Sequence, residues 1–364
     1  MLAKLTHWPS LLFVFILTAC GGSEQGPYVT DLQANQLAYG KLSTFTLTGA
    51  SLNKGVALSV TGCSNLKQDA SSTDTSQIWT CFIDSVGAQT LKLTAKTATG
   101  VVLAEKSFDV AVPTSPVVLN IQSDRLMYSK TSQFTFVGQA LNKDFNLTLK
   151  NCKSPAKVAG GSATVQTISC TVNGVGTDVV SVEAKLADGT ALMSKTFTVP
   201  MPQVSMLTNL GSISLELNPT AAPNTASNFL QYVNDKFYDN TIIHRLVTSG
   251  IFVAQGGWLT PVPAVQAGQR TAISLEVGKG LSNLKGTIAM ARSADLNSAT
   301  SQFFFNLSDN TALDTANGGY AVFGKVISGT TVLDAISNVP TSTQYGLSDF
   351  PSQSVIVQSV IQTQ

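Results

Sequence analysis

The chain has 364 residues, enough for two or three domains, and 43% of them are hydrophobic while only 12% are charged. Since about a quarter of the residues are charged in typical soluble domains, uncharged polar residues and glycine must cover this surface, as in exported β-rich proteins. The 22 basic and 21 acidic residues leave a net charge of +1, which argues against binding to nucleic acid or to an anionic membrane surface.

The N-terminus predicts export. Residues 1–19 carry a positive charge near the start, at Lys4, and an apolar run over residues 11–19. This run is far shorter than the roughly 20 apolar residues that a membrane-spanning helix needs. A charged start and a short apolar run are typical of a signal peptide, which export removes.

The end of this segment predicts a lipid anchor. Leu17-Thr18-Ala19-Cys20 resembles the lipobox of bacterial lipoproteins, which implies lipidation of Cys20 and a lipidated tether over residues 20–26. Gly21 stands where the inner-membrane retention signal of that family would place Asp. The resemblance therefore implies a lipid-anchored protein of the cell envelope, at the outer membrane and facing the periplasm. The alternative is ordinary secretory cleavage after Ala19, with a free thiol at Cys20.

Residues 27–113 and 116–202 are predicted to be two copies of one module, because residues recur between them at a constant displacement. The recurring pairs include Cys63 with Cys152, Cys81 with Cys170, Leu52-Asn53-Lys54 with Leu141-Asn142-Lys143, and Gly100 with Gly189. Short alternating apolar and polar runs between turn residues are typical of β-sandwiches. We therefore predict two Ig-like β-sandwich modules, each of which serves either as a spacer or as a binding surface for a peptide, a partner protein or an envelope polymer.

The four cysteines of the modules predict two disulfides. An exported protein meets an oxidising compartment, so we expect Cys63–Cys81 and Cys152–Cys170. Closing a loop of this size stabilises a protein by roughly 3 kcal/mol on the chain-entropy model. A zinc site would need clustered Cys or His ligands, but the modules contain neither CxxC nor histidine. We predict no metal site here, and nothing in the sequence demands a cofactor.

Residues 203–364 follow a different pattern, that of a mostly antiparallel β-domain with few helices. Apolar residues at helical spacing predict one helix over residues 225–233. Alternating runs predict strands at residues 212–217, 241–247, 252–255, 286–291, 302–307, 321–326 and 355–361. A domain of this length can close into a barrel.

Six blocks of this domain form a motif series. In chain order they are Ala222–Phe229, Tyr238–Arg245, Gln255–Gly257, Gly286–Arg292, Ser301–Asn306 and Tyr320–Val326. They resemble successive blocks of the bacterial cyclophilins, which are peptidyl-prolyl cis/trans isomerases. The resemblance runs from about residue 204 to the end of the sequence. It implies a closed antiparallel β-barrel with a few short helices, and an enzyme that acts on proline-containing polypeptides without a cofactor.

Isomerisation of an X–Pro bond requires no nucleophile, no metal ion and no proton acceptor. The conjugated amide resists rotation by about 18–20 kcal/mol, and a fixed guanidinium near the prolyl nitrogen stabilises the twisted state selectively. The resemblance assigns this guanidinium to Arg245 and further catalytic roles to Phe252 and Gln255. It assigns the substrate-binding roles to Ala291, Arg292, Gln302, Phe304, Leu313 and Tyr320. Because amide rotation transfers no proton, we interpret His244 as a structural residue.

Three departures from the family pattern bear on function. Residues 248–251 lengthen the segment between Arg245 and Gln255, and Val253 replaces a methionine of the pocket. Ala312 stands where related proteins carry an aromatic ring, so we expect weak or no cyclosporin binding. The leading interpretation is a lipid-anchored isomerase that assists the folding of exported proteins. The departures leave open a noncatalytic envelope protein, peptide-binding or adhesin-like.

Overall fold

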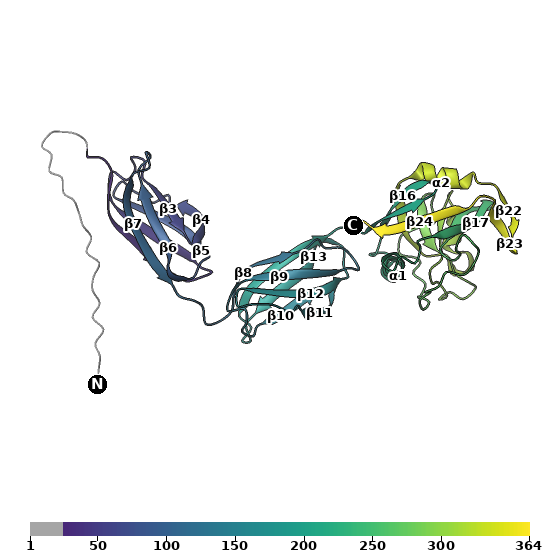
Figure 1. Cartoon of the computed structure of the whole chain (residues 1–364), viewed down its shortest axis with the longest axis horizontal. Coiled ribbons are helices and arrows are strands. Elements are labelled where there is room, and N and C mark those ends of the chain that lie inside the picture. The colour runs from purple at the N-terminus through teal and green to yellow at the C-terminus, as the bar shows by residue number, and fades with distance from the viewer. Residues whose placement is uncertain (1–24) are drawn as a thin grey trace. The chain divides into compact units, whose positions relative to one another are not determined.

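The computed structural model describes residues 25–364, which form mainly β-strands (Figure 1). The predicted signal peptide, Cys20 and most of the predicted tether lie outside the described residues. The chain divides into two compact units, one that ends at Val112 and one from Pro113 to Gln364. Within residues 25–364, no helix is both long enough and apolar enough to cross a membrane.

The first module consists of two antiparallel sheets. One sheet has the order β1-β2-β5-β4 and the other the order β3-β6-β7. The strands are β1 (Tyr28–Asn35), β2 (Leu42–Ala50), β3 (Ala57–Thr61), β4 (Cys63–Gln68), β5 (Ser76–Ile83), β6 (Gly87–Lys96) and β7 (Val102–Val110). Alternate residues of β2 and β6, among them Phe45, Leu47, Leu91 and Leu93, are fully buried between the sheets. This burial explains the period-two pattern of the sequence.

The second module repeats the first strand for strand. Its sheets have the orders β11-β12-β9-β8 and β10-β13-β14. The strands are β8 (Val117–Ser123), β9 (Thr131–Gln139), β10 (Asn146–Lys150), β11 (Cys152–Lys157), β12 (Val165–Val172), β13 (Gly176–Lys185) and β14 (Ala191–Val199). The disulfides Cys63–Cys81 and Cys152–Cys170 are both present, with Cα atoms 5.9 and 5.5 Å apart, and they confirm the predicted pairing. Each joins two neighbouring strands of one sheet.

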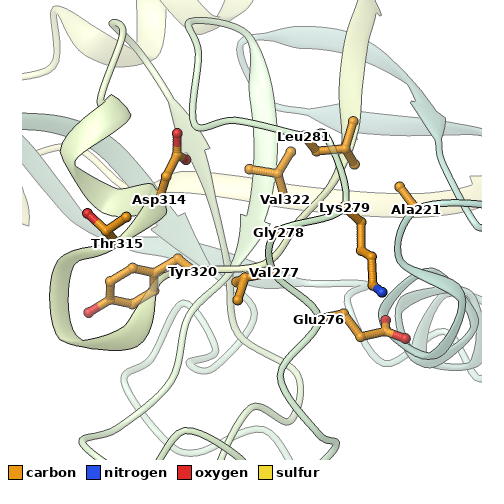
Figure 2. Close-up of a pocket in the computed structure, with 10 residues that line it drawn as sticks. All are labelled: Ala221, Glu276, Val277, Gly278, Lys279, Leu281, Asp314, Thr315, Tyr320 and Val322. Carbon is orange, nitrogen blue, oxygen red and sulfur yellow. The ribbon is translucent and has the colours of Figure 1, made fainter.

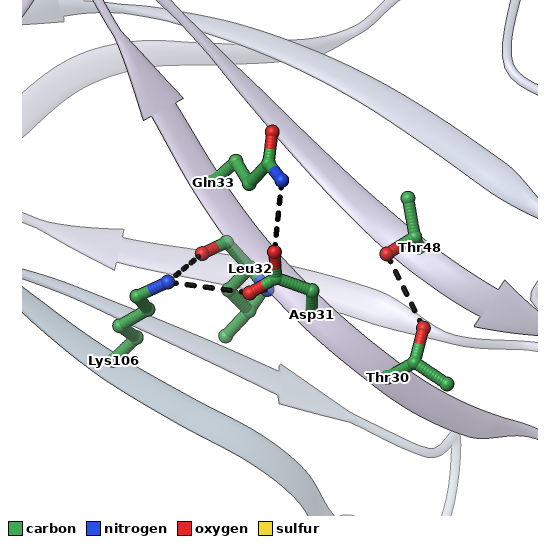
Figure 3. Close-up of polar contacts among 6 residues, drawn as sticks. All are labelled: Thr30, Asp31, Leu32, Gln33, Thr48 and Lys106. Atoms are coloured by element: carbon green, nitrogen blue, oxygen red, sulfur yellow. Dashed lines mark hydrogen bonds and ion pairs between the residues drawn. The ribbon is translucent and has the colours of Figure 1, made fainter. Parts of the chain in front are cut away.

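One lysine at the same place in each module connects the last strand to the first, and so joins the two sheets. Lys106 on β7 lies 3.2 Å from the Asp31 carboxylate and donates to the next backbone carbonyl at 2.7 Å (Figure 3). Lys195 on β14 makes the same two contacts, with the Asn120 side-chain oxygen and the carbonyl after it. A β-bulge precedes both Asp31 and Asn120. The duplication therefore preserved a detail of the packing, with a charged acceptor in one copy and a neutral one in the other.

The C-terminal domain is a closed barrel of eight strands in the order β15-β16-β21-β19-β20-β18-β17-β24. The strands are β15 (Gln203–Thr208), β16 (Gly211–Leu217), β17 (Thr241–Ser249), β18 (Ile251–Gly256), β19 (Thr287–Met290), β20 (Phe303–Asn306), β21 (Val322–Ser328) and β24 (Val355–Gln362). All the pairings are antiparallel. The predicted all-β architecture with a closed barrel is thereby confirmed.

An aromatic cluster fills the barrel core. Helix α1 (Pro223–Asn234) contributes Phe229, whose ring lies 5.1 Å from those of Tyr238 and Phe323 and 5.8 Å from that of Phe303. All four side chains are fully buried. Tilted and edge-to-face ring pairs of this kind add to the stabilisation from buried area. The helix predicted over residues 225–233 is confirmed as the central part of α1.

Strand β15 and several smaller elements of the barrel domain were not predicted by position. Helix α2 (Thr330–Ser337) buries Leu333 and Ile336 against the barrel. The hairpin of β22 (Thr341–Gln344) and β23 (Leu347–Pro351) lies outside the barrel beside β17. The 3-10 turns η1 (Thr311–Asp314) and η2 (Ala316–Gly318) precede β21.

The second module and the barrel belong to one compact unit. The Tyr128 hydroxyl donates to the Pro223 carbonyl at 3.3 Å, and the Gln362 amide donates to the Tyr128 carbonyl at 2.9 Å. Arg125 donates to the Thr363 carbonyl at 2.9 Å. These contacts join the start of the second module to helix α1 and to the C-terminal end of the chain.

Candidate active site

The hairpin of β17 and β18 carries the predicted catalytic arginine. Arg245 pairs with Gln255 across the two strands, and the register shifts between Ile243 and Arg245. His244 is therefore the extra residue of a β-bulge. Bulges often lie next to active sites, where they redirect a neighbouring side chain. Here the bulge directs Arg245 toward a cavity on one side of the hairpin.

The extra residues between Arg245 and Gln255 lengthen this hairpin without disordering its pairing. Ser249 pairs with Ile251 around Gly250, whose φ of +75° suits glycine at the tip of a tight turn. Side chains alternate along a strand, so Ile251, Val253 and Gln255 share one face. The predicted site residue Phe252 does not share it.

The active-site cavity has a volume of about 170 Å³. Its lining residues are Arg245, Ile251, Val253, Gln255, Ala291, Arg292, Phe304, Leu313 and Tyr320. The structure thus brings together all the predicted catalytic and substrate-binding residues except Phe252 and Gln302. Phe252 is 40% exposed and does not line the cavity. Ile251, which the sequence did not indicate, lies in the wall.

Gln302 lies beneath the cavity as a support. The Gln255 side-chain amide donates to the Gln302 side-chain oxygen at 2.9 Å. The Gln302 backbone carbonyl in turn accepts the Ala291 N–H at 2.9 Å. Gln302 therefore fixes the orientation of the Gln255 amide, which faces the cavity, instead of lining the cavity itself.

The floor of the cavity is apolar. Val253, Ala291 and Phe304 line it and are buried in one cluster, against which Leu313 and Tyr320 pack. The Phe304 and Tyr320 rings meet edge to face at 5.8 Å. A floor made of these side chains suits a small apolar ring such as that of proline.

Arg292 holds the wall of the cavity in place. Its guanidinium lies 4.6 Å from the centre of the Tyr320 ring, within range of a cation–π contact. It also donates to the carbonyls of Asn317 and Gly319, at 2.5 and 2.8 Å. Most of its donors are therefore committed to the turn that precedes Tyr320, so its main effect is to fix that ring.

A buried asparagine network, which no pattern in the sequence indicated, supports the other end of the cavity. Asn310 accepts the Phe252 N–H at 3.1 Å and donates to the Phe252 carbonyl at 2.9 Å. It also donates to Asn306, which donates to Asn283. Because Asn310 begins the turn that bears Leu313, the network joins the start of β18 to that wall.

The structure provides Arg245 with an acidic neighbour. Its Nε lies 3.8 Å from the Asp349 carboxylate on β23. Asp239, which is closer to Arg245 in the sequence, instead accepts the Val360 N–H at 3.0 Å. The contact with Asp349 leaves the terminal nitrogens of the guanidinium for the cavity that Arg245 lines.

His244 has the properties of a buried structural residue. It is 3% exposed, and its ring meets the Trp258 ring edge to face at 5.3 Å. Burial lowers the pKa of His244 to about 4, and the nearby charge of Arg245 adds to this shift. The imidazole is therefore neutral at neutral pH. Among the described residues, no group of three or more His, Cys, Asp or Glu side chains could hold a metal ion.

The site thus combines the guanidinium of Arg245, the oriented amide of Gln255 and an apolar floor. Residues 203–362 match the family described as cyclophilin type peptidyl-prolyl cis-trans isomerase/CLD. The matched segment contains every residue of the active-site cavity.

Curated relatives match the same segment. The chain is 47% identical over 160 residues to a peptidyl-prolyl cis-trans isomerase of Acinetobacter baylyi, covering 43% of this chain and 83% of the relative. It is 45% identical to the isomerase cyp18 of Streptomyces antibioticus, with 44% of this chain and 97% of the relative covered. It is 39% identical to isomerase B of Escherichia coli, with 43% and 97% covered.

A solved structure is also similar. It is a cyclophilin type peptidyl-prolyl cis-trans isomerase of Cryptosporidium parvum, with 26% sequence identity and a TM-score of 0.38. The similarity covers 45% of this chain and 98% of that one.

Proposed function

The chain belongs to the cyclophilin-type family of peptidyl-prolyl cis-trans isomerases and is an isomerase, and from this premise we propose that it is lipid-anchored in the cell envelope and assists the folding of exported proteins. The observation that carries the isomerase function is the position of Arg245 at the edge of the active-site cavity, whose floor is apolar. That cavity joins a cation to a floor that fits a proline ring.

The geometry suggests how each group acts. The floor of Phe304 and Leu313 would hold the prolyl ring still while the preceding carbonyl turns. As conjugation is lost, the prolyl nitrogen becomes a better hydrogen-bond acceptor, and the Arg245 guanidinium stabilises it more than it stabilises either planar isomer. Gln255, fixed by Gln302, would orient the substrate backbone. No proton is transferred, which agrees with a neutral, buried His244.

The envelope role rests on the lipobox-like sequence at Cys20 and on the two modules. Both modules carry disulfides, which persist in oxidising compartments such as the periplasm. Several acyl chains on one cysteine would anchor the chain stably, since each buried CH₂ contributes about 0.8 kcal/mol. The modules, which we interpret as Ig-like, would serve as spacers between the anchor and the isomerase domain.

Turnover of an X–Pro peptide series tests the enzymatic part of the proposal. Arg245→Ala should lower kcat/KM by roughly 100-fold, the usual effect of losing one electrostatic donor in an active site. Arg270→Ala is the matched control, because Arg270 is an exposed arginine that pairs with Asp235 outside the cavity. Equal rates for the wild type and Arg245→Ala would remove Arg245 from the mechanism.

The anchor needs a separate experiment. Metabolic labelling with a fatty-acid analogue should label the wild type but not Cys20→Ser, and the variant should leave the membrane fraction. A wild type that carries no label and fractionates as a free periplasmic protein would contradict the anchor without affecting the isomerase activity.

A client-binding role beside isomerisation is the second candidate. The exposure of Phe252 outside the cavity favours it, because a family residue of the pocket is then replaced by Ile251. This role predicts that client peptides bind with equal affinity to the wild type and to Arg245→Ala, although only the wild type accelerates isomerisation.

A further inference from the structure

A second cavity of about 200 Å³ lies beside the active-site cavity, and Tyr320 lines both (Figure 2). The walls of the second cavity include the apolar side chains of Val277, Leu281 and Val322. Figure 2 shows these side chains on the side of Tyr320 away from its phenol oxygen. The second cavity contains neither Arg245 nor Gln255, so it is not part of the isomerisation site.

The two cavities share one apolar floor. Leu281 and Val322, from the second cavity, belong to the same cluster as Val253, Phe304 and Leu313 of the active-site cavity. The Tyr320 ring is fixed between them by its edge-to-face contact with Phe304 and by the Arg292 guanidinium. The wall between the cavities is therefore rigid, and an extended chain could cross it without moving it.

The two carboxylates at the second cavity are already engaged. Glu276 accepts the N–H of Thr225 at 2.8 Å and that of Asn224 at 3.1 Å, at the N-terminus of helix α1. Asp314 accepts hydrogen bonds from Ser282 and from Asn283. Both carboxylates thus lie where backbone and side-chain donors compensate their charge.

Lys279 has no ionic partner among the residues that the structure describes. It is exposed at the edge of the second cavity. Its ammonium group is therefore available to a ligand. Apolar walls with one such cation at the edge suit a polypeptide that carries an apolar side chain beside a carboxylate.

We propose that the second cavity is a client subsite, which takes an apolar side chain from the segment flanking the isomerised proline while Lys279 selects an acidic neighbour. This inference rests on the isomerase function proposed above and not on the lipid anchor. An extended chain advances about 3.5 Å per residue, so the side chain that lies beyond Tyr320 belongs to a residue outside the X–Pro pair. Substrates that stop at the X–Pro pair would not reach it.

The test compares short and extended peptides on the full chain. The short peptide contains only the X–Pro pair with blocked ends. The extended peptides carry a further pair of residues, either Leu–Asp or Leu–Lys. In one set this pair precedes the X–Pro pair, and in the other set it follows it. Both kcat/KM and the dissociation constant are measured. The wild type should prefer the Leu–Asp peptides over the short peptide by about tenfold, the value of one buried aliphatic side chain.

Two variants locate that preference. Lys279→Glu should lower the preference for Leu–Asp over Leu–Lys by about threefold or more, as expected for an exposed ion pair. Val277→Phe should fill the cavity and lower the ratio of extended to short kcat/KM by about tenfold. Lys236→Glu, an exposed lysine just beyond the other end of helix α1, should leave both ratios as in the wild type.

Each outcome decides the matter. Equal kcat/KM and equal affinity for short and extended peptides in the wild type would overturn the subsite, as would equal ratios in Lys279→Glu and Lys236→Glu. Extended peptides that bind more tightly in a Lys279-dependent manner, without turnover of any peptide, would support the subsite and contradict the isomerase function instead.

Discussion

The Nε atom of Arg245 lies 3.8 Å from the Asp349 carboxylate, across more than a hundred residues of sequence. Asp349 reaches this position because Phe350, the next residue, is buried with Ile242 and Leu259 on the outside of the barrel. The φ of Asp349 is +59°, in the left-handed region, which Asp tolerates better than most residues. The hairpin of β22 and β23 thus places a carboxylate on the side of the guanidinium away from the substrate.

This contact predicts that Asp349 positions Arg245 for catalysis. Asp349→Asn keeps the shape and tolerates the same backbone conformation but removes the charge, so kcat should fall about three- to tenfold with little change in KM. Exposed ion pairs contribute little to stability, so thermal stability should hardly change. In an Arg245→Ala background, the same substitution should have no further effect on the rate.

The matched control is Asp334→Asn, which breaks the exposed pair with Lys285 on the same domain. It should leave kcat as in the wild type. If Asp349→Asn lowers the rate by the same factor with and without the Arg245 side chain, Asp349 acts on something other than the guanidinium.

Burial of His244 predicts how stability depends on pH. Because the pKa of His244 is lowered from 6.5 to about 4 in the folded protein, the unfolded chain binds the extra proton first as the pH falls. The stabilisation is complete above pH 6.5 and is lost between pH 6.5 and 4, by at most about 3 kcal/mol. Thermal unfolding of wild type and His244→Gln across this range measures it, since the variant cannot titrate there.

The kcat of the enzyme should not depend on pH in the way that its stability does. Amide rotation transfers no proton, and the imidazole stays neutral in the folded enzyme above about pH 5, so kcat should be flat from pH 5.5 to 8. A rate that rises with an apparent pKa near 6.5 would give His244 a role in turnover that this geometry does not provide.

The duplicated lysine contact offers an internal comparison. The pKa of Asp31 is lowered by the hydrogen bond from Gln33 and, in addition, by Lys106, whereas Asn120 in the second module does not titrate. The stabilisation from Asp31 is therefore complete above its unfolded pKa and lost as the pH falls through the lower folded value. Calorimetry should show Asp31→Asn less stable than wild type at pH 6, with the difference vanishing below about pH 3.

The reciprocal substitution is the control. Asn120→Asp places a carboxylate beside Lys195 and should raise the stability of the second module at pH 6 but not below pH 3. A difference between Asp31→Asn and wild type that is independent of pH would mean that the side chain acts through packing and not through its charge.

Sequence reasoning worked where a local pattern sets the structure. The two disulfides followed from cysteines that recur at one displacement, and the barrel followed from alternating strands and the six family blocks. It failed at Asp349, because no periodicity in residues 341–351 indicates that a polar hairpin packs beside Arg245. It also missed α2, which is short and buries only Leu333 and Ile336.

The lengthened hairpin explains why Phe252 lies outside the cavity although the family resemblance placed it in the pocket. Family resemblance assigned Phe252 to the pocket by its distance from Gln255 in the sequence. In the structure the strand pairing continues to Ser249 and Ile251, and strict alternation then decides which side chains face the cavity. A comparison of blocks does not contain this information, because it follows from the position of the turn.

A pair of alanine variants tests this difference directly. Ile251→Ala should raise KM for X–Pro peptides about fivefold, since it removes part of the apolar wall that the prolyl ring contacts. Phe252→Ala should raise KM less than twofold, because that side chain is 40% exposed and lies outside the cavity. The opposite order would mean that the substrate draws Phe252 into the pocket on binding, and that the hairpin changes its register when the enzyme is loaded.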